Sequence, residues 1–284
     1  MKKYLFIVLL SFALLYSFKT DKTIKSIIPK GYELVWSDEF DYSGKPDTSK
    51  WSLEYGYIAN NEAQYYTDSL KNARVENGAL IIEANKEKIK NSGFVSKDDP
   101  SWKKNSEYAS YTSSRLVTRN IAEWQYGVIE VKAKIPRGVG MWPAIWMLGK
   151  NQAEVGWPKC GEIDIMEHVG YYQDSIFGTI HTGAYNHMIG TQKGSSIYIE
   201  HPYDQFHTYS IEWTPQKIDF FLDGTVYFNV TNEHKTTAEW PFDQPFYMIL
   251  NIAVGGSWGG VKGIDDSVFP QQMVIDYVRV YQIK

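Results

Sequence analysis

The stretch YGVIEVKAKI, residues 126–135, alternates apolar and charged side chains along most of its length. In an extended chain the two kinds of side chain fall on opposite sides: Ile129, Val131, Ala133 and Ile135 on one, and Glu130, Lys132 and Lys134 on the other. A period of two is typical of a β-strand with one face in a core and one face in solvent. The stretch therefore predicts a half-buried strand.

The same pattern recurs in short pieces along the rest of the chain. Asp223-Gly224 stands between two apolar runs, which is the signal of a two-residue hairpin turn. Many short strands separated by glycine and proline, with no convincing amphipathic helix of three turns, predict an all-β sandwich or barrel. The segments with strand character are 33–40, 79–84, 111–118, 163–167, 176–181, 207–213, 218–222, 225–230, 246–253 and 273–282.

The domain organisation follows from what lies between these segments. No linker, internal repeat or low-complexity tract divides the sequence, and the polar, lysine-rich stretch 86–107 is predicted to be a long loop. We expect residues 30–284 to form one domain, because all-β sandwiches of this length occur as single units.

The composition excludes several classes of protein. The chain has 284 residues, a net charge of −4, 43% hydrophobic residues and one cysteine. It can bury a full core, which excludes a disordered or fibrous protein. The mild acidity argues against a nucleic-acid partner, because phosphate binding requires a strong basic excess. The single cysteine excludes an internal disulfide framework. Much of the aromatic content, 10 Trp, 21 Tyr and 13 Phe, must lie in the core, but ten tryptophans are more than packing usually needs.

The N-terminus has the pattern of a targeting segment. Lys2 and Lys3 precede an uncharged, mostly apolar run that ends at Phe18. The run is short for a membrane span of about 20 residues but fits the apolar region of a secretory signal. We predict a signal peptide over residues 1–22, with a short membrane anchor as the alternative. The protein is then expected to be secreted, periplasmic or at the cell surface.

Residues 161–170 read GEIDIMEHVG and place three carboxylates within six positions: Glu162, Asp164 and Glu167. On a regular strand, residues two apart share a face, so the first two carboxylates point together and the third points away. One extra residue returns the third carboxylate to the same side. We therefore predict a β-bulge near Ile165 or Met166.

Carboxylates on one strand face suit glycoside hydrolysis. In retaining glycosidases one carboxylate attacks the sugar carbon, and a second protonates the leaving oxygen and later activates water. Acids this close cannot all ionise at low cost, so one of them is expected to keep its proton near neutral pH. The alternatives are a calcium site and an acidic strand face in solvent.

Aromatic residues gather around this segment. Trp142 and Trp146 lie in MWPAIWML, residues 141–148, and Trp157 comes shortly before the carboxylates. Their flat, stiff rings can stack on sugars, and core packing is the alternative use. The scarcity of lysine and arginine near them favours a neutral ligand.

These segments resemble glycoside hydrolase family 16, and within it the laminarinase-like endo-β-1,3-glucanases. The family's E-x-D-x-x-E strand is matched by Glu162, Asp164 and Glu167. Other segments occur in the order found in that family: WSDEF at 36–40, NNEAQYYT at 60–67, YTSSR at 111–115, YGVIEVKAKIP at 126–136, MWPAIWMLG at 141–149, WPKCGEIDIMEHVG at 157–170, FHTYSIEWT at 206–214, WPFDQPFYMILNIAVGG at 240–256 and DYVRVYQ at 276–282.

The resemblance implies a jelly-roll, concanavalin-like β-sandwich with a substrate cleft across its concave sheet. It implies Glu162 as nucleophile, Glu167 as acid/base, and Asp164 as the carboxylate that holds and polarises the nucleophile. It also implies retention of the anomeric configuration, with no cofactor for catalysis.

The resemblance also implies a set of substrate contacts. Asn60, Arg115, Trp142 and Trp146 should line the subsites on the non-reducing side of the cleaved bond. The alternative to a cleft position for Arg115 is a place in a surface ion pair. Further candidate contacts are Trp157, His181, which has a purely structural alternative, and Trp258, on a glycine-rich loop at the cleft edge.

Many members of the family hold a structural calcium ion away from the cleft. The matching positions are Glu39 and Gly78, through backbone oxygens, and Asp276, through its side chain. One carboxylate with carbonyl oxygens is a sparse donor set for calcium. The alternative is that Asp276 only makes a local hydrogen bond within its strand.

The expected function is hydrolysis of internal β-1,3 bonds in laminarin-type glucans by a monomer whose partner is a neutral polysaccharide. Mixed-linkage β-1,3-1,4-glucan and galactans are alternative substrates. A transglycosylase or a non-catalytic β-glucan-binding protein would be a different outcome on the same fold, since a fold alone does not set the function.

Overall fold

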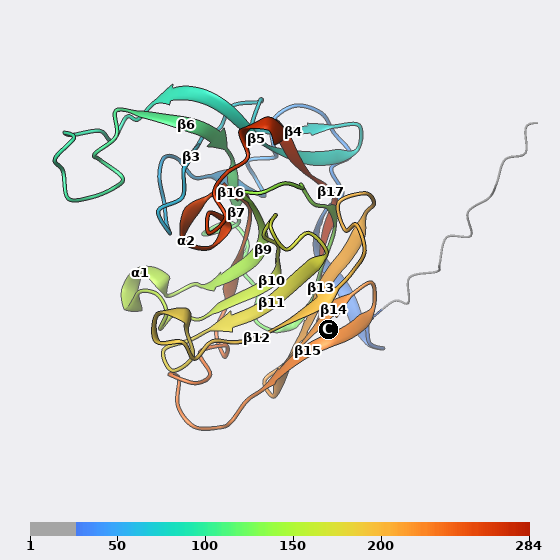
Figure 1. The fold of residues 1–284 in the computed structure, drawn as a ribbon. Coiled ribbons are helices and arrows are strands. Elements are labelled where there is room, and N and C mark those ends of the chain that lie inside the picture. The colour runs from blue at the N-terminus through green and yellow to red at the C-terminus, as the bar shows by residue number, and fades with distance from the viewer. Residues whose placement is uncertain (1–26) are drawn as a thin grey trace, which may run out of the picture.

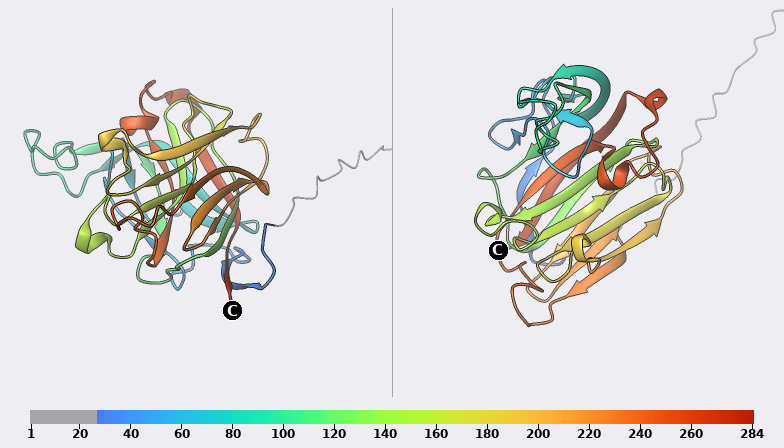
Figure 2. Two further views of the ribbon diagram at one scale, coloured as in Figure 1. Left: turned by 90° about the horizontal axis from the view of Figure 1, so that it is seen from below. Right: turned by 60° about the vertical axis from the view of Figure 1, so that its left-hand side comes forward.

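The computed structural model describes residues 27–284, so the signal peptide predicted for residues 1–22 lies outside the described residues. Two β-sheets stack face to face as a jelly-roll β-sandwich, as the sequence predicted (Figure 1). Two further views show the sheets as adjacent layers (Figure 2).

The larger sheet has ten strands, and its pairs are antiparallel except for β3 with β6. Its order is β15-β14-β13-β8-β17-β5-β6-β3, with β1 beside β17 and β4 beside β5. The strands are β1 (Tyr32–Asp38), β3 (Gln64–Tyr66), β4 (Ala73–Glu76), β5 (Ala79–Lys90), β6 (Tyr108–Ser113), β8 (Gly127–Lys134), β13 (His207–Trp213), β14 (Lys217–Leu222), β15 (Thr225–Thr231) and β17 (Gln271–Ile283).

The smaller sheet has seven antiparallel strands in the order β12-β11-β10-β9-β16-β7-β2. Its strands are β2 (Ser52–Leu53), β7 (Arg115–Val117), β9 (Met141–Gly149), β10 (Glu162–Glu167), β11 (Ser175–His181), β12 (Lys193–Tyr198) and β16 (Phe246–Val254). In the part of the chain that the structure describes, four short helices lie in the connections: α1 (Gln152–Val155), η1 (His187–Ile189), α2 (Gly256–Gly259) and η2 (Asp266–Val268). Within residues 27–284, no helix has the length and apolar content needed to cross a membrane.

The strand from which the sequence analysis started is β8, near the middle of the larger sheet. Its apolar residues are buried and its charged residues are half-buried, as the alternation predicted. The predicted hairpin is also present, because Asp223 and Gly224 join β14 to β15 with positive φ angles of 49° and 75°. This turn requires that left-handed backbone, which explains the choice of Asp-Gly.

Two of the expected segments differ in the structure. Strand β5 continues to Lys90, so the first part of the stretch predicted as a loop is paired with β6 instead. Its lysines and glutamates alternate between exposed and half-buried positions, and this polar alternation hid the strand in the sequence. The segment 111–118 is two strands, β6 and β7, because the chain passes from one sheet to the other at the buried Ser114.

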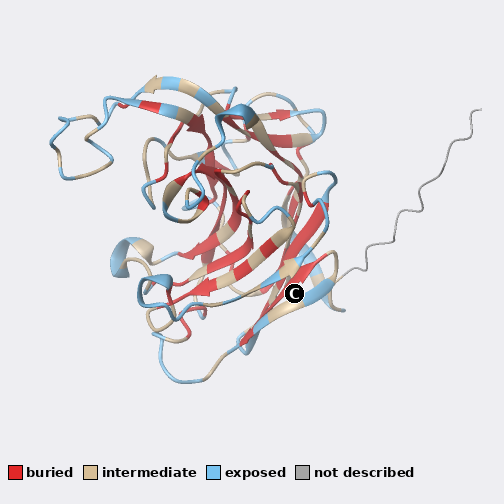
Figure 3. Cartoon of the chain, viewed as in Figure 1, coloured by how far each residue is buried: buried red, intermediate tan, exposed pale blue. Residues whose placement is uncertain are grey.

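The core fills the space between the sheets, and buried positions follow the central strands (Figure 3). Trp51 and Trp213 are fully buried there, so part of the tryptophan content serves packing. Strand β16 is buried at all nine positions, because it runs through the middle of the smaller sheet. The face of this sheet that points away from the core carries the half-buried Trp142 and Trp146.

Candidate active site

A β-bulge in β10 brings the three carboxylates together. Asp164 pairs with Trp146 on β9, whereas Met166 pairs with Ile145, so Ile165 is an extra residue in the ladder. The register against β11 shifts over the same interval. The predicted bulge is therefore present, and Glu162, Asp164 and Glu167 all line one cavity.

The cavity has a volume of about 360 Å³ and lies on the outer face of the smaller sheet. A second cavity of about 650 Å³ adjoins it over β11 and β12. Both are bordered by five residues: Asn60, Trp142, Glu162, Glu167 and His187. The two cavities together form an open cleft that crosses the carboxylates.

Tryptophan side chains hold the two glutamates in place. Trp157 Nε1 donates to Glu162 Oε2 at 2.9 Å, and Trp142 Nε1 donates to Glu167 Oε1 at 3.0 Å. A carboxylate with little water around it needs such donors, because an unsatisfied buried charge is costly. Two of the three tryptophans that the sequence placed near the carboxylates, Trp142 and Trp157, therefore contact them directly, whereas Trp146 donates to Asn251.

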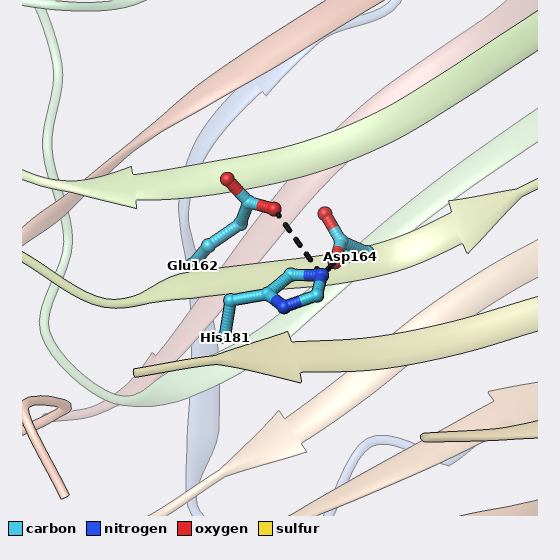
Figure 4. Close-up of side chains that lie close together, drawn as sticks. All are labelled: Glu162, Asp164 and His181. Carbon is cyan, nitrogen blue, oxygen red and sulfur yellow. Dashed lines mark ion pairs between the residues drawn. The ribbon is translucent and has the colours of Figure 1, made fainter. Parts of the chain in front are cut away.

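His181 lies beside the nucleophile candidate on the neighbouring strand (Figure 4). Its Nε2 atom is 3.7 Å from Glu162 Oε1 and 3.6 Å from Asp164 Oδ2. Burial, helped by the nearby His187, lowers the pKa of His181 to about 4, so its imidazole is neutral at neutral pH. The position makes His181 a contact of the carboxylates and a lining residue of the second cavity.

Burial raises the pKa of all three carboxylic acids. For Glu162 and Asp164 the negative charges of the neighbouring acids add to the effect of burial, because like charges oppose ionisation. Asp164 also shares a side-chain hydrogen bond with Glu162, which favours the charged form of Glu162 and the protonated form of Asp164. The cluster therefore retains protons near neutral pH, as acid catalysis requires.

A metal ion is the alternative use of this cluster. Ligand atoms of Glu162, Asp164 and His181 lie within 4.8 Å of one another. Calcium takes six to eight oxygen ligands, whereas this set contributes two carboxylates and a nitrogen. In addition, the indole N–H of Trp157 already occupies one oxygen of Glu162. The arrangement suits acid/base and nucleophilic chemistry better than a calcium site.

Arg115 lies at the other end of the first cavity, at the start of β7. Its Nε is 2.7 Å from Glu54 Oε2, and its guanidinium stands 4.8 Å from the centre of the Trp146 ring. The side chain is only 7% exposed, so the alternative of a surface ion pair does not describe it. Arg115 is therefore a buried residue of the cleft lining, and its partner Glu54 is half-buried.

A hydrogen-bonded network behind this end of the cleft was not foreseen. Trp146 Nε1 donates to Asn251 Oδ1 at 2.7 Å, and Asn251 Nδ2 donates to Tyr66 Oη at 3.1 Å. Glu62 then accepts from Tyr66 at 3.4 Å and from Asn60 Nδ2 at 3.2 Å. The network links two of the expected substrate contacts, Trp146 and Asn60, through buried groups.

The sequence held a signal for part of this network. Asn251 is a lone amide in an otherwise apolar strand, and such a residue needs a partner. His187, Phe177 and Thr179, which line the second cavity, carry no comparable signal. Trp258, on α2, also borders that cavity, and its ring packs edge-on against Trp142 at 5.5 Å.

The residues expected to hold calcium lie around β17, an interior strand of the larger sheet: Glu39 follows β1, Gly78 precedes β5, and Asp276 lies on β17 itself. Asp276 occupies an irregularity of β17, next to the position where that strand pairs with Leu80 just after Gly78. Its carboxylate is 2.8 Å from Lys132 Nζ, and the Glu39 carboxylate is bound by Arg279. Because an ammonium already neutralises the single side-chain ligand, the present donor set fits calcium poorly.

Comparisons with known proteins agree with the geometry of the cleft. A model of glycosyl hydrolases family 16 matches residues 60–279. The chain is 51% identical over 261 residues to a beta-glucanase of Rhodothermus marinus. The alignment covers 88% of this chain and 85% of that protein.

Two solved structures are similar over nearly the whole described chain. The laminarinase from Rhodothermus marinus has a TM-score of 0.79 and 49% identity, over 88% of this chain and 97% of its own. A non-specific endo-β-1,3(4)-glucanase of family 16, crystallised with 1,3-β-D-cellotriosyl-glucose, has a TM-score of 0.81 and 46% identity. The match covers 90% of this chain and 96% of that one. The family model and these relatives show that the chain belongs to glycoside hydrolase family 16.

Proposed function

We propose that this protein is an endo-acting β-1,3-glucanase of the laminarinase type that cleaves with retention of configuration. The observation that supports the proposal most strongly is the bulged strand β10, which presents the buried Asp164 and the half-buried Glu162 and Glu167 to an open cleft bordered by tryptophan. The names of the most similar relatives, a beta-glucanase and a laminarinase, agree with it.

In the proposed mechanism, the Glu162 carboxylate attacks the anomeric carbon of the sugar. Glu167 gives its proton to the glycosidic oxygen as the bond to the leaving chain breaks. Glu167 then takes a proton from water, and the water oxygen attacks the anomeric carbon and displaces Glu162. Two displacements at one carbon give net retention.

The neighbouring groups adjust the nucleophile. Asp164 keeps its proton because burial raises its pKa, and it can donate that proton toward Glu162. This hydrogen bond, with the one from Trp157, stabilises the Glu162 carboxylate when it departs from the sugar. The neutral His181 completes the enclosure without adding a positive charge.

We propose that Asn60, Arg115, Trp142 and Trp146 hold the non-reducing half of the substrate, over β9, β16 and β7. Aromatic rings beside the carboxylates suit a neutral glucan, because they stack on the apolar faces of sugar rings. Mixed-linkage glucan is the second candidate substrate, because a relative with 46% identity is described as a non-specific endo-β-1,3(4)-glucanase.

We also propose that the protein acts outside the cytoplasm and as a monomer. The basic start and the apolar run of residues 1–22 support export. The presence of both candidate catalytic glutamates, Glu162 and Glu167, supports an enzyme over a non-catalytic glucan-binding protein.

The substrate is tested by the release of reducing ends from four polymers: linear β-1,3-glucan, mixed-linkage β-1,3-1,4-glucan, agarose and a sulfated galactan. We expect the fastest release from β-1,3-glucan, with oligosaccharides of several lengths as the first products. Activity on a galactan alone would contradict the proposed substrate. Release of glucose alone from the start would contradict endo action.

The role of Glu162 is tested by Glu162→Ala. The variant should fold normally and lose at least about a thousandfold in kcat, because it lacks the nucleophile. Azide should restore cleavage of an aryl β-glucoside substrate by Glu162→Ala and give the α-glycosyl azide, whereas Glu167→Ala with azide should give the β-azide. Glu154→Ala, on the exposed helix α1, is the matched control. NMR of the unaltered enzyme should show β-reducing ends first, and early α-product would rule out retention.

The raised pKa values predict how stability depends on pH. A carboxylic acid whose pKa is higher in the folded state binds more protons there, so its contribution to stability is lost as the pH rises above the ordinary Glu value near 4.5. Glu162→Gln cannot ionise, so it should exceed the original protein in stability by about 1–3 kcal/mol near pH 8 and by much less near pH 5. Thermal melts at both pH values measure this, with Glu154→Gln as control. If Glu162→Gln differed from the original protein by the same amount of stability at both pH values, the assignment of a proton-retaining cluster would be refuted.

A structural calcium ion at Glu39, Gly78 and Asp276 remains a prediction that calcium addition can test. Binding would require Lys132 to leave the Asp276 carboxylate. If the ion binds, millimolar calcium should raise the melting temperature relative to EDTA, because a ligand of the folded state stabilises it. Asp276→Asn should remove that increase, and an equal increase in the variant would place the calcium elsewhere.

A further inference from the structure

The indole that holds the proposed nucleophile lies against a histidine that the proposed mechanism does not use. Trp157 Nε1 donates to Glu162 Oε2 at 2.9 Å. The ring of His187, on η1, is 4.9 Å from that of Trp157 and tilted by 35° to it. His187 also borders both cavities of the cleft. A single ring therefore separates this histidine from the carboxylate that attacks the sugar.

His187 packs against the other neighbour of the nucleophile as well. Its ring is 5.1 Å from that of His181 and meets it edge to face, at 90°. His181 Nε2 lies 3.7 Å from Glu162 Oε1, whereas Trp157 donates to Oε2. The two oxygens of the carboxylate thus face two different rings, and His187 contacts both. These are ring contacts, so they depend on the shape of the His187 side chain.

One buried amide fixes the position of His187. Asn186 is 4% exposed; its Nδ2 atom donates to Thr182 O at 3.0 Å, and its Oδ1 atom accepts from Met188 N at 3.1 Å. The two residues that follow His187, Met188 and Ile189, are exposed to solvent. Side-chain to backbone bonds of this kind give an exposed turn a defined conformation. The turn therefore presents His187 to the cleft in a fixed orientation.

We infer that His187 is a positioning residue for the nucleophile, because its ring keeps the indole N–H of Trp157 directed at Glu162. The inference rests on the proposed function, which makes Glu162 the nucleophile. Trp157 is only half-buried, and it packs against a small cluster that includes Leu148 and Cys160. Without the His187 ring, the indole gains freedom to turn away from the carboxylate, and a loosely supported contact is a less effective one.

The hydrogen bond from Trp157 affects the charge of Glu162 as well as its direction. Burial and the Glu167 carboxylate raise the pKa of Glu162, whereas the hydrogen bond from Trp157 lowers it. The other titratable or charged groups near this carboxylate are Asp164, His181, Arg115 and Cys160. A looser indole therefore raises the Glu162 pKa. The acid limb of kcat/KM, where the nucleophile must lose its proton, then moves to higher pH.

His187→Ala and His187→Phe test the role of the ring on linear β-1,3-glucan. The alanine variant should lose about three- to tenfold in kcat with less than about a twofold change in KM, because the nucleophile is affected and the sugar contacts are not. Its acid limb should move up by about 0.3–1 pH unit. The phenylalanine variant should restore both values, because it keeps a flat ring against Trp157 but cannot donate a hydrogen bond or titrate.

Two further variants complete the comparison. His187→Gln keeps hydrogen-bonding atoms without a ring and should behave like His187→Ala, which keeps the test valid if the alanine variant does not fold. Ile189→Ala, at an exposed position of the same short helix, is the matched control and should behave like the original protein. Asn186→Ala should lower kcat in the same way and add little to His187→Ala, because both act through one contact.

Two results would overturn the inference while the proposed function stands. One is a raised KM with an unchanged kcat and acid limb in the alanine and phenylalanine variants, which would make His187 a direct sugar contact. The other is no change in any of these values. Failure of the original protein to cleave any glucan would instead contradict the proposed function itself.

Discussion

One extra residue in β10 is the constraint on which the active site depends. A regular strand would send Glu167 to the opposite side of the sheet from Glu162, into a core of isoleucine and methionine. The bulge at Ile165 instead turns Glu167 into the cleft while Ile163 and Met166 remain buried. The same residue thus preserves the core and completes the catalytic group, so a deletion that restored a regular ladder would damage both.

Three carboxylates on one face of β10 repel one another when they are ionised, and the surrounding residues reduce this electrostatic cost in a specific way. Indole N–H groups are donors without a charge, so Trp142 and Trp157 satisfy carboxylate oxygens without fixing them permanently as ion pairs. The cationic Arg115 is kept beside Trp146 and neutralised by Glu54. A lysine or arginine next to Glu167 would lower its pKa and weaken it as an acid. The choice of tryptophan in the catalytic centre is therefore electrostatic as well as a matter of shape.

The sequence allowed most of the sandwich to be predicted, because period-two alternation and the Asp223-Gly224 turn are local signals. It also allowed the bulge to be predicted, since three acids in one apolar strand make sense only on one face. The continuation of β5 to Lys90 was missed because its polar alternation resembles a loop when its partner strand is unknown. The network from Trp146 to Asn60 was missed for a different reason. Its members come from three separate segments of the chain, around residues 60–66, 146 and 251, and only the folded register brings them together.

The two halves of the cleft are built differently, and the difference suits a two-step reaction. The half over β9 and β16 is held by a hydrogen-bonded network with buried members, which leaves Trp146 and Asn60 little freedom. The half over β11 is bordered by Phe177 and Trp258, whose rings meet edge to face, and Tyr172, which is 54% exposed, is tilted against Phe177. In double displacement the glycosyl unit must remain in register through both steps, whereas the leaving chain must depart before water or another sugar enters. Directional hydrogen bonds preorganise the first half for that task, and non-directional ring contacts let the second half release one occupant and accept the next.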